Sequence, residues 1–438
     1  MLRIGSGAGF AGDRIEPAKA LVEEGNLDYL VLEGLAERTI ALSQKQKQID
    51  PSLGYNEYLD ERIRVLLPLL LKNNVRLITN MGAANPNSAA QKIIEIAKEM
   101  GVACKVVAVT GDDVLDKLNG DFVVFESGKS LQDYTPLISA NAYLGVESLL
   151  PALETEANII VTGRVADPSL FLAPIVHHYG WDLENYNLIG QGTLIGHLLE
   201  CAGQITGGYF ADPGRKEVEG LEDLGFPYAM IEPNGDAIIT KLANTGGIVN
   251  LQTVKEQLLY EVHDPASYYT PDCIADFTTV KLKEIGKDQV LVSGASGKRK
   301  PDLLKVSVGY HAGFLGEGEI SYAGSTALQR GELAQHILKK RLLKNYPKLK
   351  TDLIGVSSLH HVQYKNIQAY EVRVRAAALC KTEEEAKKIG HEVEALYTNG
   401  PAAGGGARKR VEEVIGIVST FINREAITVK TKAWECRV

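Results

Sequence analysis

The chain has 438 residues, of which 45% are hydrophobic and 23% charged, and its formal net charge is −8. This length exceeds one ordinary domain, and the composition is that of a globular protein with a sizeable core. The negative charge argues against a nucleic-acid or membrane-surface partner, and no apolar run approaches the roughly 20 residues that span a bilayer.

Strands and helices alternate through the first part of the chain. Short apolar strands are predicted at Leu2–Ile4, Asp28–Glu33, Val75–Asn80, Cys104–Val109 and Asn158–Val161. This alternation predicts an α/β fold with a mostly parallel sheet and flanking helices in the N-terminal half. Polar residues recur at the carboxyl ends of these strands, which is where ligands bind in open α/β sheets.

The pattern becomes β-rich after Asp276, and strand pairs joined by two helices follow. The predicted elements are strands at 277–282, 289–293, 304–310 and 318–322, a helix at 326–345, strands at 353–362 and 370–379, a helix at 382–397 and a strand at 414–421. This order predicts a smaller α+β domain, of which a ferredoxin-like arrangement is one form. We therefore divide the chain into an α/β ligand-binding domain (1–215), a connecting β-rich and helical segment (216–300) and an α+β domain (301–438).

The five cysteines are far apart in the sequence and form no C-x-x-C pair. They predict neither a disulfide framework nor a structural zinc site. Because the N-terminus runs straight into a strand and a glycine pattern, we predict no signal peptide and a cytoplasmic protein.

The first strand leads into the pattern Gly7-x-Gly9-x-x-Gly12, and Glu33 ends the second strand. This layout matches a dinucleotide fingerprint, in which the glycines admit a pyrophosphate and the acid binds ribose hydroxyls. Asp13 follows the last glycine, however, and would repel a pyrophosphate at this helix N-terminus. We therefore favour a loop that binds a carboxylate or part of a coenzyme A chain, with NAD(P) binding or a tightly packed turn as alternatives.

The turn from Thr162 to Pro168 follows the last apolar strand, and Pro168 begins a helix. Arg164 and Asp167 should therefore lie at the carboxyl end of a strand and face a helix N-terminus. Arg164 could clamp a substrate carboxylate while Asp167 orients its guanidinium. The alternative is an Arg–Asp pair that only locks the turn.

Two adjacent carboxylates, Asp112 and Asp113, follow the fourth strand. Crowding raises the pKa of one carboxylate in such a pair, which suits an acid/base, and a pair of this kind also suits a magnesium-like ion. An N-cap role at the helix that follows is equally compatible with the pattern.

His197, Glu200 and Cys201 share one face of a predicted helix, at spacings i, i+3 and i+4. The group could ligate a metal or form a Cys–His nucleophile site. A partly buried, hydrogen-bonded helix face is the simpler alternative. We retain His197 as a second acid/base candidate.

With these motifs assembled, the chain resembles the acyclic terpene utilisation (AtuA) family, a domain-of-unknown-function family. The resemblance covers most of the chain, and its most specific stretches are Gly5–Arg14, Leu35–Thr39, Thr79–Pro86, Thr162–Leu170, Gly196–Cys201, Thr206–Asp212, Lys255–Pro265 and Gly316–Tyr322. It implies a role in the catabolism of branched acyl-CoA compounds and related carboxylic acids, with a small partner protein in some members. It supplies no catalytic residues, so each site residue rests on its own position and chemistry.

We therefore expect a catabolic enzyme that acts on a small carboxylic acid or its CoA thioester, as a hydratase/dehydratase or a carbon–carbon lyase. Arg164 would hold a carboxylate, and Asp112, Asp113 or Glu33 would move the proton. Backbone N–H groups of the Gly5–Gly12 and Met81–Asn85 loops would stabilise an enolate-like oxyanion. The predicted substrate site comprises Gly7, Gly9, Asp13, Arg38, Asn80, Gly82, Asn85 and Arg164.

Two other functions remain open: an NAD(P)-dependent oxidoreductase that uses the first loop, and a non-catalytic subunit that completes a partner's site. A homo-oligomer or a small protein partner also remains open, and if a metal takes part, the carboxylates make it magnesium-like. The parallel sheet makes one geometric prediction. Glu33, Asn80, Asp112 and Arg164 should all face one cleft.

Overall fold

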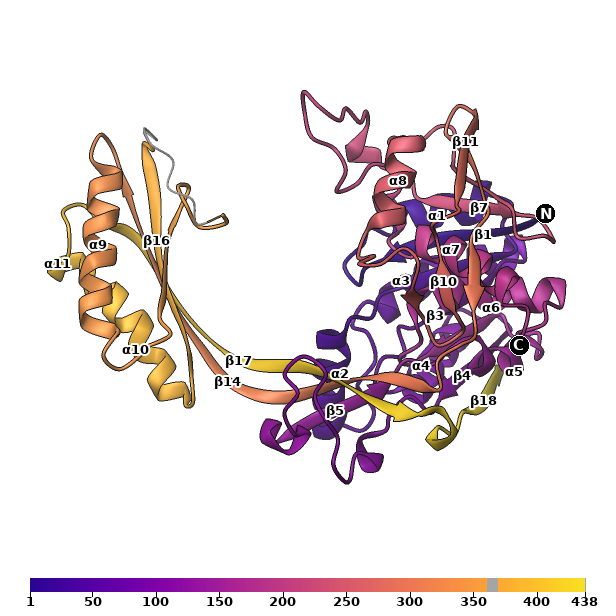
Figure 1. Cartoon of the computed structure of the whole chain (residues 1–438), viewed down its shortest axis with the longest axis horizontal. Helices are drawn as coiled ribbons and strands as arrows, with labels where there is room; N and C mark the ends of the chain where they lie inside the picture. The colour runs from indigo at the N-terminus through magenta and orange to yellow at the C-terminus, as the bar shows by residue number, and fades with distance from the viewer. Residues whose placement is uncertain (361–368, 438) are drawn as a thin grey trace. The chain divides into compact units, whose positions relative to one another are not determined.

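The computed structural model describes residues 1–360 and 369–437, which form two compact units. Unit 1 comprises Met1–Asp133, Ile138–Gly309 and the residues from Ile417 onward, and unit 2 comprises Tyr134–Leu137 and Tyr310–Gly416. Two long strands, β14 (Leu303–Ala323) and β17 (Gly405–Asn423), each run from one unit into the other (Figure 1).

Unit 1 is built on a ten-stranded sheet in the order β11-β12-β8-β7-β1-β2-β3-β6-β4-β18. Its five central strands are parallel to one another. They are β1 (Leu2–Gly9), β2 (Tyr29–Glu33), β3 (Arg76–Thr79), β6 (Ile159–Thr162) and β4 (Cys104–Thr110). These five strands are the ones that the N-terminal half predicts, so the α/β class is confirmed.

Antiparallel strands extend both edges of this sheet, which makes it mixed overall. On the β1 side they are β7 (Pro227–Ile231), β8 (Ala237–Lys241), β12 (Gln289–Ser293) and β11 (Lys281–Gly286), and on the β4 side β18 (Lys430–Cys436). Most of the strands predicted as a connecting segment at 216–300 thus join the main sheet of unit 1. The chain after residue 417 also returns to unit 1, although both stretches lie outside the predicted first domain.

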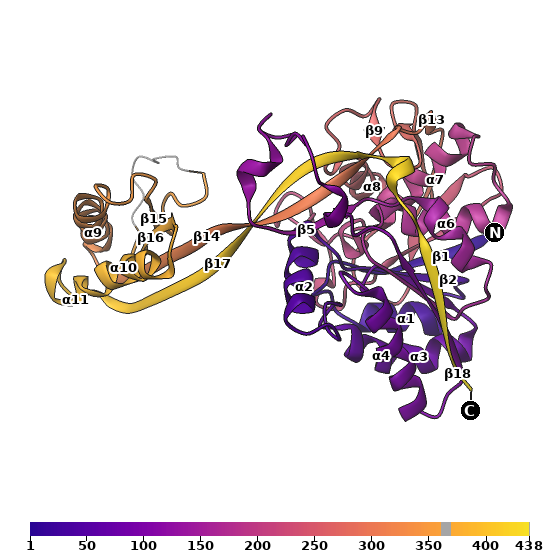
Figure 2. The same cartoon turned by 90° about the horizontal axis from the view of Figure 1, so that it is seen from below.

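Helices cover both faces of the central strands, as Figure 2 shows. One face packs against α1 (Glu16–Glu24), α3 (Leu59–Asn73) and α4 (Pro86–Glu99), and the other against α6 (Asp167–Tyr179) and α7 (Tyr186–Leu199). Because both faces are covered, every residue of β2 and β6 is buried, which explains why each strand is apolar up to the polar residue that ends it. The covering helices leave the carboxyl ends of β2, β3 and β6 on one edge of the parallel set.

Unit 1 also contains other helices, another strand and a small sheet. They are α2 (Glu37–Ile49), α5 (Leu150–Leu153), α8 (Leu251–Leu259), β5 (Leu137–Ala142), which pairs with β14, and the three-stranded sheet of β13 (Ser296–Lys298), β10 (Ile274–Asp276) and β9 (Tyr268–Tyr269). Within the described part of the chain, no helix combines the length and the apolarity that crossing a membrane requires.

Unit 2 contains the strands β15-β16-β14-β17, in that order, of a five-stranded sheet whose fifth strand is β5, and it has its own apolar core. Its elements besides β14 and β17 are α9 (Ala327–Leu342), β15 (Lys350–Ile354), β16 (Glu371–Cys380), α10 (Glu383–Glu394) and α11 (Leu396–Asn399). The strand predicted at 353–362 overlaps the end of β15, and its last two positions, 361 and 362, lie outside the described residues.

Helices α6 and α7 approach each other closely because α7 has glycine where they meet. A Cβ atom added at Gly196 would lie 2.4 Å from the carbonyl oxygen of Pro168, the second residue of α6. A Cβ atom at Gly192 would meet the Leu172 side chain at the same distance of 2.4 Å. These contacts bring the start of α6 against the end of α7, and with it Asp167 toward His197.

We predict that Gly196→Ala lowers the free energy of unfolding by about 1–3 kcal/mol, because the added methyl group meets backbone atoms that cannot move aside cheaply. Urea denaturation followed by circular dichroism measures this change. Gly405→Ala is the matched control, since a Cβ atom there meets nothing within 4 Å. Equal stability of the two variants would contradict the close approach of α6 and α7.

Candidate functional site

The carboxyl ends of β2 and β3 carry two side chains that bind each other. Oε1 of Glu33 accepts hydrogen bonds from the Asn80 amide nitrogen at 2.9 Å and from the Leu35 N–H at 2.8 Å. Oδ1 of Asn80 accepts from the Gly34 N–H at 2.9 Å. All of these groups are buried, so the two strand ends form one rigid hydrogen-bonded unit.

Arg164 lies beyond the end of β6 and is only 1% exposed. Its Nη1 donates to the Leu35 carbonyl oxygen at 2.5 Å, and its Nε and Nη2 donate to the Val165 carbonyl oxygen at 3.1 and 2.8 Å. Nη2 also donates to the Asp167 carboxylate. Arg164 therefore joins the β2 loop to the β6 turn and positions Asp167, and its burial keeps it from clamping a substrate carboxylate.

Asp112, at the end of β4, lies behind this turn and supports it. Its Oδ2 accepts hydrogen bonds from the Arg164 N–H and the Asn141 amide, both at 2.9 Å. A Cβ atom at Gly163 would lie 2.5 Å from the same carboxylate, so only glycine fits between them. Burial raises the pKa of Asp112 to about 6, opposed by these hydrogen bonds. The structure thus brings Glu33, Asn80 and Arg164 together and gives Asp112 an anchoring position.

Glu33 and Asp167 form a pair of carboxyl groups on either side of Arg164. Burial and the negative charge of Asp167 together raise the pKa of Glu33 to about 8, opposed by Arg164 and by the hydrogen bonds from Leu35 and Asn80. Burial also raises the pKa of Asp167, but 35% of its side chain is exposed and Arg164 donates to it, which limits the rise. The hydrogen bond from Arg164 therefore favours the ionised form of Asp167, whereas burial and the charge of Asp167 favour the protonated form of Glu33.

His197 and Glu200, at the end of α7, form a second acid/base pair. Nδ1 of His197 lies 2.8 Å from Oε1 of Glu200, and Nε2 lies 3.3 Å from the Leu258 carbonyl oxygen. Because that carbonyl oxygen can only accept, Nε2 carries a proton. A second proton must lie between Nδ1 and Oε1 of Glu200, because both atoms would otherwise be acceptors. Burial raises the pKa of Glu200 to about 7, and its Oε2 has no partner among the described residues.

Three residues that the sequence did not single out complete the wall beside Arg164. The Tyr143 ring lies between the guanidinium of Arg164, 4.6 Å from the ring centroid, and the ammonium of Lys305, at 4.9 Å. The Tyr143 hydroxyl donates to Glu37 at 2.5 Å. Burial alone would raise the pKa of Glu37, but this hydrogen bond and Lys305 lower it. No local motif marks these residues, since Glu37 and Lys305 are 268 positions apart.

The glycines of the first loop serve packing. Gly7 and Gly9 lie within β1, where added Cβ atoms would come 2.7 Å from the Leu32 side chain and 2.4 Å from the Cys201 backbone. The Gly9 N–H donates to the Asp13 carboxylate at 2.7 Å. The amide that a pyrophosphate or a substrate carboxylate would need at Gly9 is therefore already used within the loop.

The loop after β3 is also hydrogen-bonded internally. The N–H groups of Met81, Ala83, Ala84 and Asn85 donate to groups of the loop itself or to Gly54. Asn85 caps α4, while its amide donates to the Pro51 and Leu53 carbonyl oxygens, and a Cβ atom at Gly82 would lie 2.4 Å from the Thr162 oxygen. These four N–H groups are not available for the oxyanion hole predicted at Met81–Asn85.

The other predicted residues lie apart from this cluster. Arg38 is exposed on the first turn of α2. Asp113 is exposed beside its buried neighbour, and its Oδ1 accepts from the Leu115 N–H at 3.3 Å in a short turn. Among the residues that the structure describes, no three His, Cys, Asp or Glu side chains gather as a metal-binding group.

The chain belongs to the acyclic terpene utilisation family, because the family model AtuA matches residues 2–433. Searches of curated proteins and of solved structures return no match. The family assignment confirms the resemblance read from the sequence and links the chain to terpene utilisation.

We predict that Asp112→Ala lowers the free energy of unfolding by about 1–3 kcal/mol, because the buried Arg164 N–H and Asn141 amide lose their acceptor. Asp112→Asn should lose less, since it keeps an acceptor oxygen. Asp113→Ala, at the exposed neighbour, is the control and should leave stability nearly unchanged. A change no larger in Asp112→Ala than in Asp113→Ala would show that the turn does not depend on this carboxylate.

Glu33 also predicts a pH dependence of stability. Because the folded chain holds the Glu33 proton more tightly than the unfolded chain, this group's stabilisation is complete below pH 4.5 and is lost as pH rises to about 8. Glu33→Gln keeps an acceptor oxygen for Leu35 and Asn80 but does not titrate. Its Tm relative to the wild type should therefore rise between about pH 5 and about pH 9. A difference in Tm that is constant over this range would contradict the raised pKa.

Proposed function

We propose that this member of the acyclic terpene utilisation family is an enzyme that adds or removes protons on a small carboxylic acid derivative, as a hydratase/dehydratase or a carbon–carbon lyase. The observation that carries the proposal is the pair of Glu33 and Asp167 beside the buried Arg164. A protonated acid next to an ionised carboxylate is the arrangement that general acid–base catalysis requires at neutral pH.

In a dehydration, Asp167 would take the proton from the carbon next to the acyl carbonyl, and that C–H electron pair would form the new carbon–carbon double bond. Glu33 would donate its proton to the departing hydroxyl as the C–O bond breaks, which releases water. Hydration is the reverse. In a carbon–carbon cleavage, the base would instead take the hydroxyl proton, and Glu33 would protonate the carbanion that is released.

The charges of the site favour a masked carboxyl group, as in a CoA thioester, over a free acid. Glu37, Asp167 and the His197–Glu200 pair surround the site, while Arg164 is buried and bonded to internal acceptors. A free carboxylate would meet mainly like charges, whereas an uncharged acyl group would not. A thioester also makes the neighbouring C–H easier to ionise than a carboxylate does.

We also infer that unit 2 is ferredoxin-like. Its order β14-α9-β15-β16-α10-β17 is that of the split βαβ motif, and the sheet order β15-β16-β14-β17 supports the same assignment.

We predict that the protein exchanges the α-hydrogens of short acyl-CoA thioesters with deuterium from D2O, measured by mass spectrometry. Asp167→Asn should slow this exchange about 100-fold or more, because it removes the base, and Glu33→Gln should slow the release of water from 3-hydroxyacyl-CoA thioesters by a similar factor, because it removes the acid. Glu23→Gln, an exposed glutamate of α1, is the control. Exchange that is unaffected by Asp167→Asn, or water release that is unaffected by Glu33→Gln, would refute the assignment of these two carboxyl groups.

A further inference from the structure

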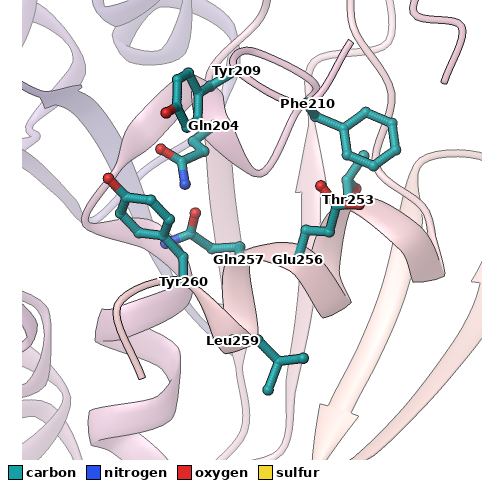
Figure 3. A pocket seen from close by; sticks show the side chains of 8 residues that line it. All are labelled: Gln204, Tyr209, Phe210, Thr253, Glu256, Gln257, Leu259 and Tyr260. Carbon is teal, nitrogen blue, oxygen red and sulfur yellow. The ribbon is translucent and has the colours of Figure 1, made fainter. Parts of the chain in front are cut away.

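A pocket of about 250 Å³ opens beside the end of α8, next to the His197–Glu200 pair. Figure 3 shows the rings of Tyr209 and Tyr260 on one side of it and that of Phe210 on the other. Its volume lies below the range of about 300–1,000 Å³ that is typical of sites for whole drug-sized ligands. The pocket is therefore sized for one segment of a longer molecule.

Gln257 connects this pocket to the proposed acid/base pair. It lines the pocket, is only 1% exposed, and its Nε2 donates to the His197 carbonyl oxygen at 3.0 Å. Because that carbonyl can only accept, the amide nitrogen must face His197, and Oε1 is left without a partner among the described residues. A buried acceptor without a donor is costly, which indicates that a ligand supplies one.

The other lining groups define the chemistry of that ligand. Tyr209, Phe210, Leu259 and Tyr260 offer apolar surface, and Gln204 offers a second neutral amide. Glu256 is the one ionisable carboxylate of the lining, and Lys216 forms an ion pair with it. The pocket therefore suits an uncharged chain with an N–H or O–H donor.

Two observations place this pocket close to the proposed reacting groups. Leu259 ends α8 and lines the pocket, and Leu258, between the lining residues Gln257 and Leu259, contacts Nε2 of His197 through its carbonyl oxygen. The negative charge of Glu261 raises the pKa of Tyr260, after burial, and that of Glu200, after burial and Asp167, so Glu261 acts on both the pocket and the acid/base pair.

We propose that this pocket binds the uncharged, amide-bearing chain that carries the acyl group of the substrate, with Gln257 Oε1 accepting an N–H of that chain. The inference rests on the proposed function for the reacting end of the substrate and adds a second subsite for its carrier. Tyr209 and Tyr260, whose ring centroids lie 6.5 Å apart, pack along the chain at the opening.

Pantetheine is the probe, because it is an uncharged chain with two amide N–H groups, and its Kd for the full-length protein is measured by ligand-observed NMR titration. Gln257→Leu should weaken binding about 3- to 10-fold, because the buried acceptor is lost. Tyr260→Ala should weaken pantetheine binding roughly 5-fold, because apolar contact is lost. If Gln257→Leu fails to fold, Tyr260→Ala tests the pocket in its place. Tyr370→Ala, a 77% exposed tyrosine of unit 2, is the matched control and should bind as the wild type does.

Pentanoate, a charged chain without an N–H donor, should bind far more weakly than pantetheine. Failure of pantetheine to bind the wild type at millimolar concentrations, or equal Kd values for the wild type and Tyr260→Ala, would overturn the pocket assignment. Binding and exchange measurements together distinguish a failure of the pocket assignment from a failure of the proposed reaction. Pantetheine binding without α-hydrogen exchange leaves the pocket in place and refutes the reaction, whereas exchange that is unaffected by both pocket variants refutes the pocket.

Discussion

The burial of one guanidinium group organises the site. Arg164 keeps its charge in the interior, so each of its nitrogens requires an acceptor, and the fold supplies the Leu35 and Val165 carbonyl oxygens and the Asp167 carboxylate. The Tyr143 ring covers the remaining face. These contacts join the ends of β2, β5 and β6 and the start of α6, so loss of any one of them would leave a buried charge short of a partner.

The protonation states follow from this arrangement. Arg164 donates directly to Asp167 and reaches the Glu33 side of the site only through the Leu35 carbonyl, so the positive charge stabilises the Asp167 carboxylate more than that of Glu33. Glu33 is buried between neutral donors and faces a negative neighbour, which favours its protonated form. Close packing of α6 on α7 at Gly196 then adds the His197–Glu200 pair to the same region.

Local sequence signals predict the parallel strands and some of the residues at their ends. Each apolar run with a polar residue at its end became a parallel strand. Glu33 and Asn80 bind each other, and Arg164 binds the loop after Glu33 through the Leu35 carbonyl oxygen. Asp112 follows the same rule and yet lies behind the turn, because Gly163 lets its carboxylate bind the backbone of Arg164. The Gly7–Gly12 pattern suggested a ligand loop, whereas the glycines make room for Leu32 and Cys201. The rest depends on long-range pairing. The antiparallel pairing of strands at the sheet edges and the Glu37–Tyr143–Lys305 contacts have no local signal.

The central claim is that Glu33 holds a proton at neutral pH while Asp167 does not. Carbon-13 NMR of protein labelled at the glutamate carboxyl carbons tests it directly, with Glu33→Gln identifying the resonance of Glu33. We expect that resonance to titrate with a midpoint of about 8. A midpoint near the usual value of 4.5 would contradict the account, because Glu33 would then be ionised at neutral pH and could not serve as the acid of the pair.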